Sequence, residues 1–245
     1  MRQRLDKAIV DRGLTQSRSQ ALSYIKLGEV FVNGAVSTKA GQLVGKNDTI
    51  DLRVEERYVS RAGLKLASVA RSFDLKFDNQ VVLDIGSSTG GFTDYALRHG
   101  ARRVIAVDVG SNQLHASLRS DPRVDLHEKT DIRDFRLELS DRPGLVLIDV
   151  SFISLKKVLP TVVKYLSKKC IQNPSLIVAM VKPQFETTPG NLNKGVVKNN
   201  SIRRQILRDF ELWAKRDFQI LKKQDSSVAG EKGNLERFYL LRPKH

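Results

Sequence analysis

Cysteine and aromatic residues are scarce in this sequence. Cys170 is the one cysteine among 245 residues, which excludes an intrachain disulfide and a zinc site built on cysteine. Aromatic residues make up 7% of the chain, and there is one tryptophan. The histidines, at His99, His115, His127 and His245, are scattered and lack the spacing of metal ligands. We therefore expect no metal site.

Long apolar runs are also missing. No run approaches the roughly 20 residues that a membrane-spanning helix needs. The first residues, Met-Arg-Gln-Arg-Leu-Asp-Lys, are not followed by the apolar core of a secretory signal. We expect a cytoplasmic protein that does not act on a membrane.

Acidic residues are outnumbered by basic ones. There are 42 lysines and arginines against 27 acids, which gives a formal net charge of +15. Such a surplus is typical of proteins that bind a polyanion, either nucleic acid or an anionic membrane surface. The length fits one medium-sized domain preceded by a small one.

The phosphate-loop motif is absent, but another glycine-rich turn is present. Residues 81–91 read VVLDIGSSTGG, an apolar run and a turn that precede a helix-forming segment, 92–99. Such a turn brings backbone N–H groups close to a ligand. The acid before the first glycine, Asp84, would repel a pyrophosphate and attract the cationic methionine end of S-adenosylmethionine. Asp108 follows Gly86 by 22 residues, where α/β nucleotide-binding units place the acid that binds ribose.

From residue 61 onward, strand patterns and helix patterns alternate. This predicts an α/β fold with a doubly wound, mostly parallel sheet of seven strands. The predicted strands are 81–85, 103–108, 124–128, 144–149, 175–181, 218–224 and 236–242, and the helices are 61–70, 91–99, 111–118, 154–168 and 200–216. Ligands bind such sheets at the carboxyl ends of the strands. Asp149 and Lys182 both fall there, and they would meet if their strands are neighbours.

The first 56 residues resemble the S4 RNA-binding module, a small α+β domain. The resemblance rests on Arg4-Leu5-Asp6, on Ser17–Ala21 and on Val32-Asn33-Gly34 after the helix that ends near Gly28. It implies that RNA contacts a basic face. The residues implicated by position are Arg4, Arg18, Ser19, Lys26 and Lys39.

The whole chain resembles the TlyA family, also known as haemolysin A: FtsJ-like RNA methyltransferases that carry an S4 domain. The matching motifs are Ser60-Arg61-Ala62-Gly63-x-Lys65-Leu66, Leu83–Asp94, Asp149–Leu155, Val181–Glu186 and Gly233-Asn234-x-Glu236. The implied domains are an S4-like domain at 1–56, a linker at 57–60 and a Rossmann-like class I methyltransferase domain at 61–245.

The resemblance implies transfer of a methyl group from S-adenosylmethionine to a ribose 2′-hydroxyl of ribosomal RNA, on the small or large ribosomal subunit. The catalytic tetrad would be Lys65, Asp149, Lys182 and Glu236. The implied cofactor contacts are Asp84, Gly86, Ser88, Gly90, Asp108 and Asp131. The segment Thr130–Asp134 offers a second acid, Asp134, for the last of these positions.

A ribose hydroxyl is a weak nucleophile that must be oriented and relieved of its proton. Lys182 would accept that proton or stabilise the developing alkoxide, and the sequence leaves open which lysine is the base.

Two alternatives remain at this stage: a ribosome-binding factor without catalysis, and a haemolysin that acts on membranes. The polar loop 186–198 is a candidate lid, and the basic helix 200–216 is a candidate phosphate contact.

Overall fold

The N-terminal part of the chain forms a small unit of two helices and short strands. The computed structural model describes residues 2–15, 18–53, 58–138, 142–166, 175–230 and 232–244. The first elements are β1 (Gln3–Arg4), α1 (Leu5–Asp11), α2 (Arg18–Leu27), β2 (Val30–Val32), β3 (Ala35–Val36), β4 (Leu43–Val44) and β5 (Ile50–Leu52). Both helices pack against the strands through one buried apolar cluster. The predicted boundary at residues 56 and 57 lies outside the described residues.

The turn predicted at Asn33-Gly34 joins β2 to β3. Both residues have positive φ, 51° and 81°, as a tight hairpin turn requires. The Asn33 side chain also fixes the following strand, because its Oδ1 accepts a hydrogen bond from the Thr49 N–H at 2.8 Å. β2 pairs with β3 on one side and with β5 on the other, which gives the sheet order β3-β2-β5.

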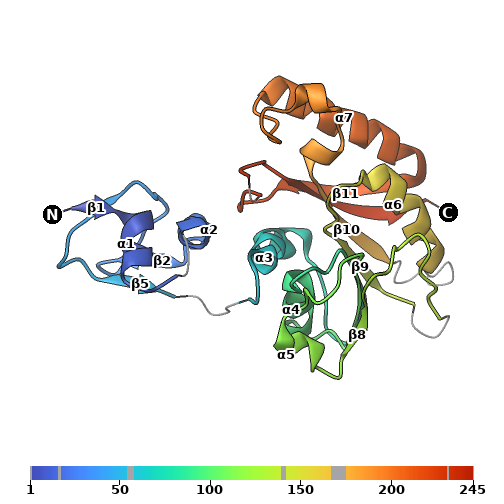
Figure 1. The fold of residues 1–245 in the computed structure, drawn as a ribbon, viewed down its shortest axis with the longest axis horizontal. Coiled ribbons are helices and arrows are strands. Elements are labelled where there is room, and N and C mark those ends of the chain that lie inside the picture. Colours follow the sequence, from blue (N-terminus) through green and yellow to red (C-terminus); the bar gives the residue numbers. More distant parts are fainter. Residues whose placement is uncertain are drawn as a thin grey trace.

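A seven-stranded sheet organises the rest of the chain (Figure 1). The strands are β6 (Val81–Ile85), β7 (Arg103–Val107), β8 (Val124–His127), β9 (Leu145–Ile148), β10 (Leu176–Val181), β11 (Phe218–Asp225) and β12 (Arg237–Pro243). Their order is β11-β12-β10-β9-β6-β7-β8, and β12 alone runs against its neighbours. The predicted α/β fold with a mostly parallel sheet is confirmed.

Helices cover both faces of this sheet. They are α3 (Arg61–Phe73), α4 (Gly91–Arg98) and α5 (Ala116–Arg119) on one face, and α6 (Leu155–Val162) and α7 (Asn200–Asp217) on the other (Figure 1). Short 3-10 turns lie at Val163–Tyr165, Pro183–Phe185 and Pro189–Asn191. Strand side chains alternate between the two cores: Leu83 joins the α6–α7 core, whereas Val82 joins the α3–α4 core. Burial on both faces explains why these strands are almost wholly apolar.

Two predicted helices differ from the structure. The prediction of a helix over 111–118 was wrong, because α5 covers only Ala116–Arg119. Asn112 has a φ of 56°, outside the helical region, and the preceding loop folds back onto Asp108. In the helix predicted over 154–168, α6 ends at Val162 and a 3-10 turn follows; residues 167 and 168 lie outside the described residues.

Candidate active site at the carboxyl edge of the sheet

The topology brings charged side chains from four strand ends to one edge. β6, β7, β9 and β10 run parallel, so Asp108, Asp149 and Lys182, which follow three of them, share that edge. β12 runs the opposite way and therefore begins there, and its first residue, Arg237, pairs with Val181. Glu236 is thus placed beside the end of β10. Because β12 is antiparallel to β10, Glu236 lies at the same edge of the sheet as Asp149 and Lys182.

The glycine-rich loop after β6 is shaped by contacts that leave no room for side chains. Gly86 has a φ of +81°, and a Cβ there would lie 2.8 Å from the Asp149 carbonyl oxygen. Gly90 has a φ of +93°, and a Cβ there would lie 2.3 Å from the Leu118 side chain. Gly86 lines the pocket described below, whereas Gly90 packs under α5. The expected direct cofactor contact of Gly90 therefore has no support in its position.

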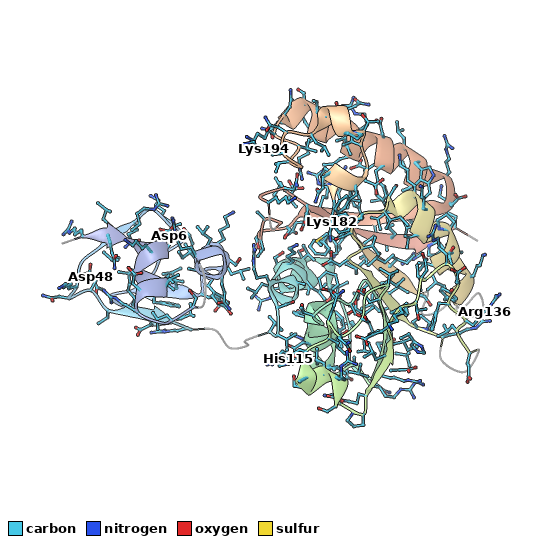
Figure 2. The ribbon with its side chains drawn as sticks, viewed as in Figure 1. Asp6, Asp48, His115, Arg136, Lys182 and Lys194 are labelled. Carbon is cyan, nitrogen blue, oxygen red and sulfur yellow. The ribbon has the colours of Figure 1, made fainter. Side chains whose placement is uncertain are left out.

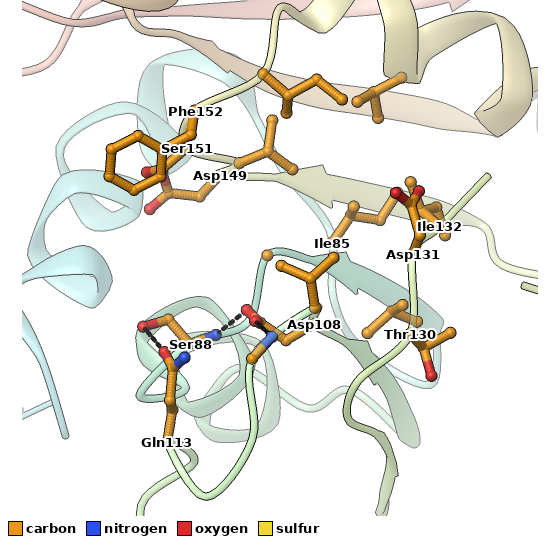
Figure 3. Close-up of a pocket in the computed structure, with 17 residues that line it drawn as sticks. Ile85, Ser88, Asp108, Gln113, Thr130, Asp131, Ile132, Asp149, Ser151 and Phe152 are labelled. Carbon is orange, nitrogen blue, oxygen red and sulfur yellow. Dashed lines mark hydrogen bonds between the residues drawn. The ribbon is translucent and has the colours of Figure 1, made fainter. Parts of the chain in front are cut away.

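A pocket of about 380 Å³ opens beside this loop (Figure 3). Ser88, Asp108 and Gln113 line one side, and Asp149, Ser151 and Phe152 line another. Apolar side chains make up much of the rest of the lining; they are Ile85, Val107, Val109, Ile132, Val150, Ile153 and Val158. A pocket lined by apolar side chains, with carboxylates among its lining residues, suits an adenosine-type ligand.

Asp108 occupies the position predicted for a ribose-binding acid. Its Oδ2 accepts a hydrogen bond from the Ser88 N–H at 2.8 Å, and its Oδ1 accepts one from the Gly110 N–H at 2.6 Å. The Ser88 hydroxyl in turn contacts Gln113 Oε1 at 3.1 Å (Figure 3). A carboxylate oxygen has more than one acceptor position, so Asp108 retains capacity for ligand hydroxyls. Gln113 is a lining residue that the sequence did not single out.

Of the two candidate acids after β8, Asp131 is a lining residue of the pocket and Asp134 is not. Asp131 lines the pocket next to Thr130 and Ile132 (Figure 3). Arg133 holds it through a 2.6 Å ion pair, and its Oδ1 accepts the Arg133 N–H at 2.9 Å. This geometry fixes a hydrogen-bond acceptor at the far end of the pocket from Asp149.

Asp84 lies beneath the loop instead of in the pocket. Its side chain is fully buried, and its Oδ2 accepts a hydrogen bond from the Thr93 hydroxyl at 2.6 Å. Burial, reinforced by the nearby charges of Asp149 and Asp108, raises the pKa of Asp84 to about 7. Asp84 is not among the lining residues, so its position favours an indirect effect on the loop and α4 over the predicted direct contact.

Lys182 and Asp149 form a largely buried ion pair at the pocket mouth. Lys182 Nζ lies 2.6 Å from Asp149 Oδ1, and the two side chains are 10% and 13% exposed. Lys182 also donates a hydrogen bond to the Ser151 hydroxyl at 2.8 Å. The predicted meeting of these strand ends is confirmed, and Ser151 is a partner of Lys182 that the sequence reasoning did not identify.

A second buried pair joins Lys65 to Glu236. Lys65 Nζ lies 2.7 Å from Glu236 Oε2, with exposed fractions of 12% and 3%. Close packing sets the position of α3: a Cβ on Gly91 would lie 2.7 Å from the backbone N of Gly63. This contact explains the small residues at the start of α3, because larger ones would displace Lys65.

An exposed aromatic side chain stands beside the first pair. Phe152 is 92% exposed, lines the pocket, and has a φ of 64°, which is unusual for a bulky residue. Its ring lies 5.1 Å from that of Phe185, the residue three positions after Lys182. A strained and exposed aromatic next to charged groups is a functional signal. Nothing in the sequence alone distinguishes Phe152 from a phenylalanine of the buried core.

Glu186 has a structural role that was not predicted from the sequence. Its Oε2 accepts the Ser154 hydroxyl at 2.6 Å, and its Oε1 accepts the Leu155 N–H at 2.7 Å. It thereby caps α6 and fixes the segment after Lys182 against the segment after Asp149. Burial raises the pKa of this carboxyl.

The residues predicted to contact RNA lie in the small N-terminal unit. Arg4 and Arg18 both pair with the buried Asp6, at 3.0 Å and 2.6 Å, and their side chains stay more than half exposed. Asp6 is labelled in Figure 2. Lys26 and Lys39 are exposed. Ser19 lies in α2, but its side chain is outside the described part of the structure. RNA contact by these residues stays a prediction.

Metal-ligand clusters and membrane-spanning helices are both absent from the described residues. In these ranges no three His, Cys, Asp or Glu side chains cluster as metal ligands. No helix in the same ranges is long and apolar enough to cross a bilayer.

Comparisons with known proteins agree with this architecture. Residues 58–243 match the FtsJ-like methyltransferase family, and residues 3–50 match the S4 domain. The chain is 38% identical to hemolysin A of Brachyspira hyodysenteriae, with 95% of this chain and 97% of that one covered. It is also 38% identical to the 16S/23S rRNA (cytidine-2′-O)-methyltransferase TlyA of Mycobacterium tuberculosis, with 98% and 90% covered.

A solved structure also matches almost the whole chain. A Streptococcus thermophilus protein described as a candidate hemolysin superimposes with a TM-score of 0.71 at 35% identity, covering 99% of this chain and 89% of that one. Sequence, topology and motif positions thus lead to one assignment. The chain belongs to the FtsJ-like methyltransferases, in the TlyA and hemolysin A group that carries an S4 domain at its N-terminus.

Proposed function

We propose that this protein transfers a methyl group from S-adenosylmethionine to a ribose 2′-hydroxyl of ribosomal RNA, with a cytidine of 16S or 23S rRNA as the target. The observation that carries the proposal is two largely buried lysine–carboxylate contacts: Lys182–Asp149 beside the pocket, and Lys65–Glu236 where β12 begins. The relative named for rRNA (cytidine-2′-O) methylation supports the substrate class.

The pocket residues fit the cofactor. S-adenosylmethionine would supply an electrophilic methyl group. Asp108 offers its carboxylate to ribose hydroxyls, Asp131 offers an acceptor to the adenine amine, and Gly86 leaves the loop open beside Asp149. A cofactor bound through these contacts would direct its methyl group toward the Lys182–Asp149 pair.

The two ion pairs would prepare the hydroxyl for attack. Asp149 and Ser151 hold Lys182 beside the pocket, where its ammonium would donate a hydrogen bond to the 2′-oxygen and stabilise the developing alkoxide. Once it has lost its own proton, the same Nζ would instead accept the proton of the 2′-hydroxyl. Glu236 holds Lys65 in the same way on the other side of the site. A fixed donor in a largely dehydrated site needs little rearrangement during the reaction, which is the main source of its effect.

The RNA would be held by two kinds of contact. Phe152, backed by Phe185, offers an aromatic face beside Asp149 on which an extruded base would stack. The exposed basic side chains of the N-terminal domain, among them Arg18 and Lys26, would dock on rRNA phosphates. Ribosomal RNA as substrate places the reaction in the cytoplasm, which is part of this proposal.

The experiment uses ribosomal subunits from a strain that lacks the gene for this chain. Tritium transfer from labelled S-adenosylmethionine is measured on 30S and 50S subunits with the intact protein, with Lys182→Ala, and with Lys164→Ala as a control of equal charge change. We expect label with the intact protein and the control, and none with Lys182→Ala. Subunit binding without label in any variant would favour a ribosome-binding factor without catalysis.

A further inference from the structure

Two surface segments near the site are locked together by one buried side chain. Asn234, 3% exposed, accepts a hydrogen bond from the Val197 N–H at 3.0 Å and donates one to the Gly195 carbonyl at 3.0 Å. The loop that contains Gly195 and Val197 is itself closed by a bridge between Asn193 and Val196. Residues 193–198 therefore move as one piece with the turn that precedes β12.

That turn is also fixed to the catalytic pair. A Cβ on Gly230 would lie 2.6 Å from Glu236 Oε1, so the turn passes directly over the carboxylate that holds Lys65. The Arg61 guanidinium donates to the Ala229 carbonyl at 2.9 Å, which ties the same turn to α3. The two segments form a fixed rim beside the site, and the candidate lid 186–198 is anchored along its second half.

The rim carries three exposed lysines, Lys194, Lys198 and Lys232. Gly195 lies between the first two, and a Cβ on it would be 3.7 Å from Lys232 Nζ. In the part of the chain that the structure describes, no carboxylate pairs with any of the three; by contrast, Lys223 pairs with Glu211 at 2.8 Å. Cations held close together on one rim repel one another, and an anionic ligand would relieve that repulsion.

We propose that this lysine rim, Lys194, Lys198 and Lys232, binds backbone phosphates of the RNA next to the reacting nucleotide. The inference rests on the proposed function for the identity of the polyanion. It adds a phosphate-binding surface on the methyltransferase domain itself. Because the rim is fixed to Glu236, RNA bound to the rim would keep a constant position relative to the site.

The test compares two triple variants of the full-length protein. One removes the rim: Lys194→Ala, Lys198→Ala and Lys232→Ala. The control removes the same charge away from the site: Lys76→Ala, Lys164→Ala and Lys244→Ala. Lys76 precedes β6 and Lys244 follows β12, so both lie at the opposite edge of the sheet. Affinity for protein-free 16S and 23S rRNA is measured between about 50 and 200 mM salt, a range over which phosphate contacts are strongly screened.

We expect the rim variant to bind rRNA at least about tenfold more weakly at low salt, with a salt slope smaller by about 2, because each lost phosphate contact removes roughly 0.7 to 0.9. The control variant and a charge-preserving variant, with arginine at the three rim positions, should keep the slope of the intact protein. Affinity for S-adenosylmethionine should not change. Equal slopes for the rim and control variants, or no rRNA binding by the intact protein, would overturn the proposal.

Binding is measured without methyl transfer, so the two proposals fail separately. An intact protein that binds rRNA through the rim but transfers no methyl group would contradict the proposed function and leave the rim supported. An intact protein that methylates rRNA while the rim variant matches the control would contradict the rim alone.

Discussion

Lys182 and Asp149 follow neighbouring parallel strands, and their charged atoms meet at 2.6 Å. Both side chains are nearly buried, so water screens their attraction weakly and the lysine is held in one place. The contact depends on the strand order: β9 and β10 are adjacent, and their carboxyl ends lie at the same edge of the sheet. This pair is the centre of the mechanism proposed here.

Asp149→Asn should abolish most of the activity while keeping the fold of the site. The amide keeps the size of the side chain but removes the charge that orients Lys182, and we expect kcat to fall by about 10² to 10⁴. Ser151→Ala removes one hydrogen bond to a charged group and should cost roughly tenfold to a hundredfold. Single-turnover rates at saturating cofactor and RNA check this order, and an equal loss in both variants would contradict it.

Breaking the Lys65–Glu236 pair should destabilise the protein more than removing both partners. Glu236→Gln leaves a nearly buried lysine without its carboxylate, and we expect the free energy of unfolding to fall by roughly 3 kcal/mol. The double variant Lys65→Met/Glu236→Gln should recover part of that loss. Urea unfolding of the two single variants and the double variant measures the coupling. Strictly additive losses would show that the pair contributes nothing as a pair.

Phe152→Ala should weaken RNA binding without weakening the fold. The ring is 92% exposed, so little apolar burial is lost, and the positive φ is less costly for a smaller residue. Loss of one stacked base corresponds to about 1 to 3 kcal/mol, which would appear as a rise of roughly 5- to 150-fold in KM for RNA. Phe152→Tyr, which keeps an aromatic face, should stay near the intact protein. An unchanged KM in the alanine variant would exclude stacking.

Asp84 should make stability fall as pH rises from about 4 to about 7. Its pKa is 3.8 as a free side chain and about 7 in the fold, so in this range the native state binds more protons than the unfolded state. Above pH 7 the native state bears the full cost of a buried charge, roughly 4 kcal/mol at about 1.4 kcal/mol per pKa unit. In Asp84→Asn this part of the pH dependence should disappear, which denaturation at several pH values would reveal. Parallel curves for the two proteins would show that Asp84 does not titrate there.

The sequence predicted the features that depend on strand ends. Apolar runs that end in Asp108, Asp149 and Lys182 define both the strands and the edge where their charges meet, because parallel strands of one sheet end on the same side. It also indicated the glycine turn, since Gly86 needs a positive φ that other residues rarely adopt.

Other features depend on packing that a linear pattern does not contain. The burial of Asp84 is fixed by Thr93 and the position of α4. The exposure of Phe152 and the contact of Ser151 with Lys182 require the folded loop after β9. The segment before α5 was predicted as helix because its residues allow one, but hydrogen bonding of Gly110 to Asp108 draws it into a loop.

The central claim is that the Lys182–Asp149 site methylates a ribose hydroxyl, and nucleoside analysis of the modified RNA tests it most directly. 16S and 23S rRNA from subunits treated with the intact protein, or with Lys182→Ala, would be digested to nucleosides and separated by mass spectrometry. We predict that the intact protein raises the amount of a 2′-O-methylated nucleoside above that of untreated subunits, and that Lys182→Ala does not. A methyl group on a base, or equal 2′-O-methylation by Lys182→Ala, would contradict it.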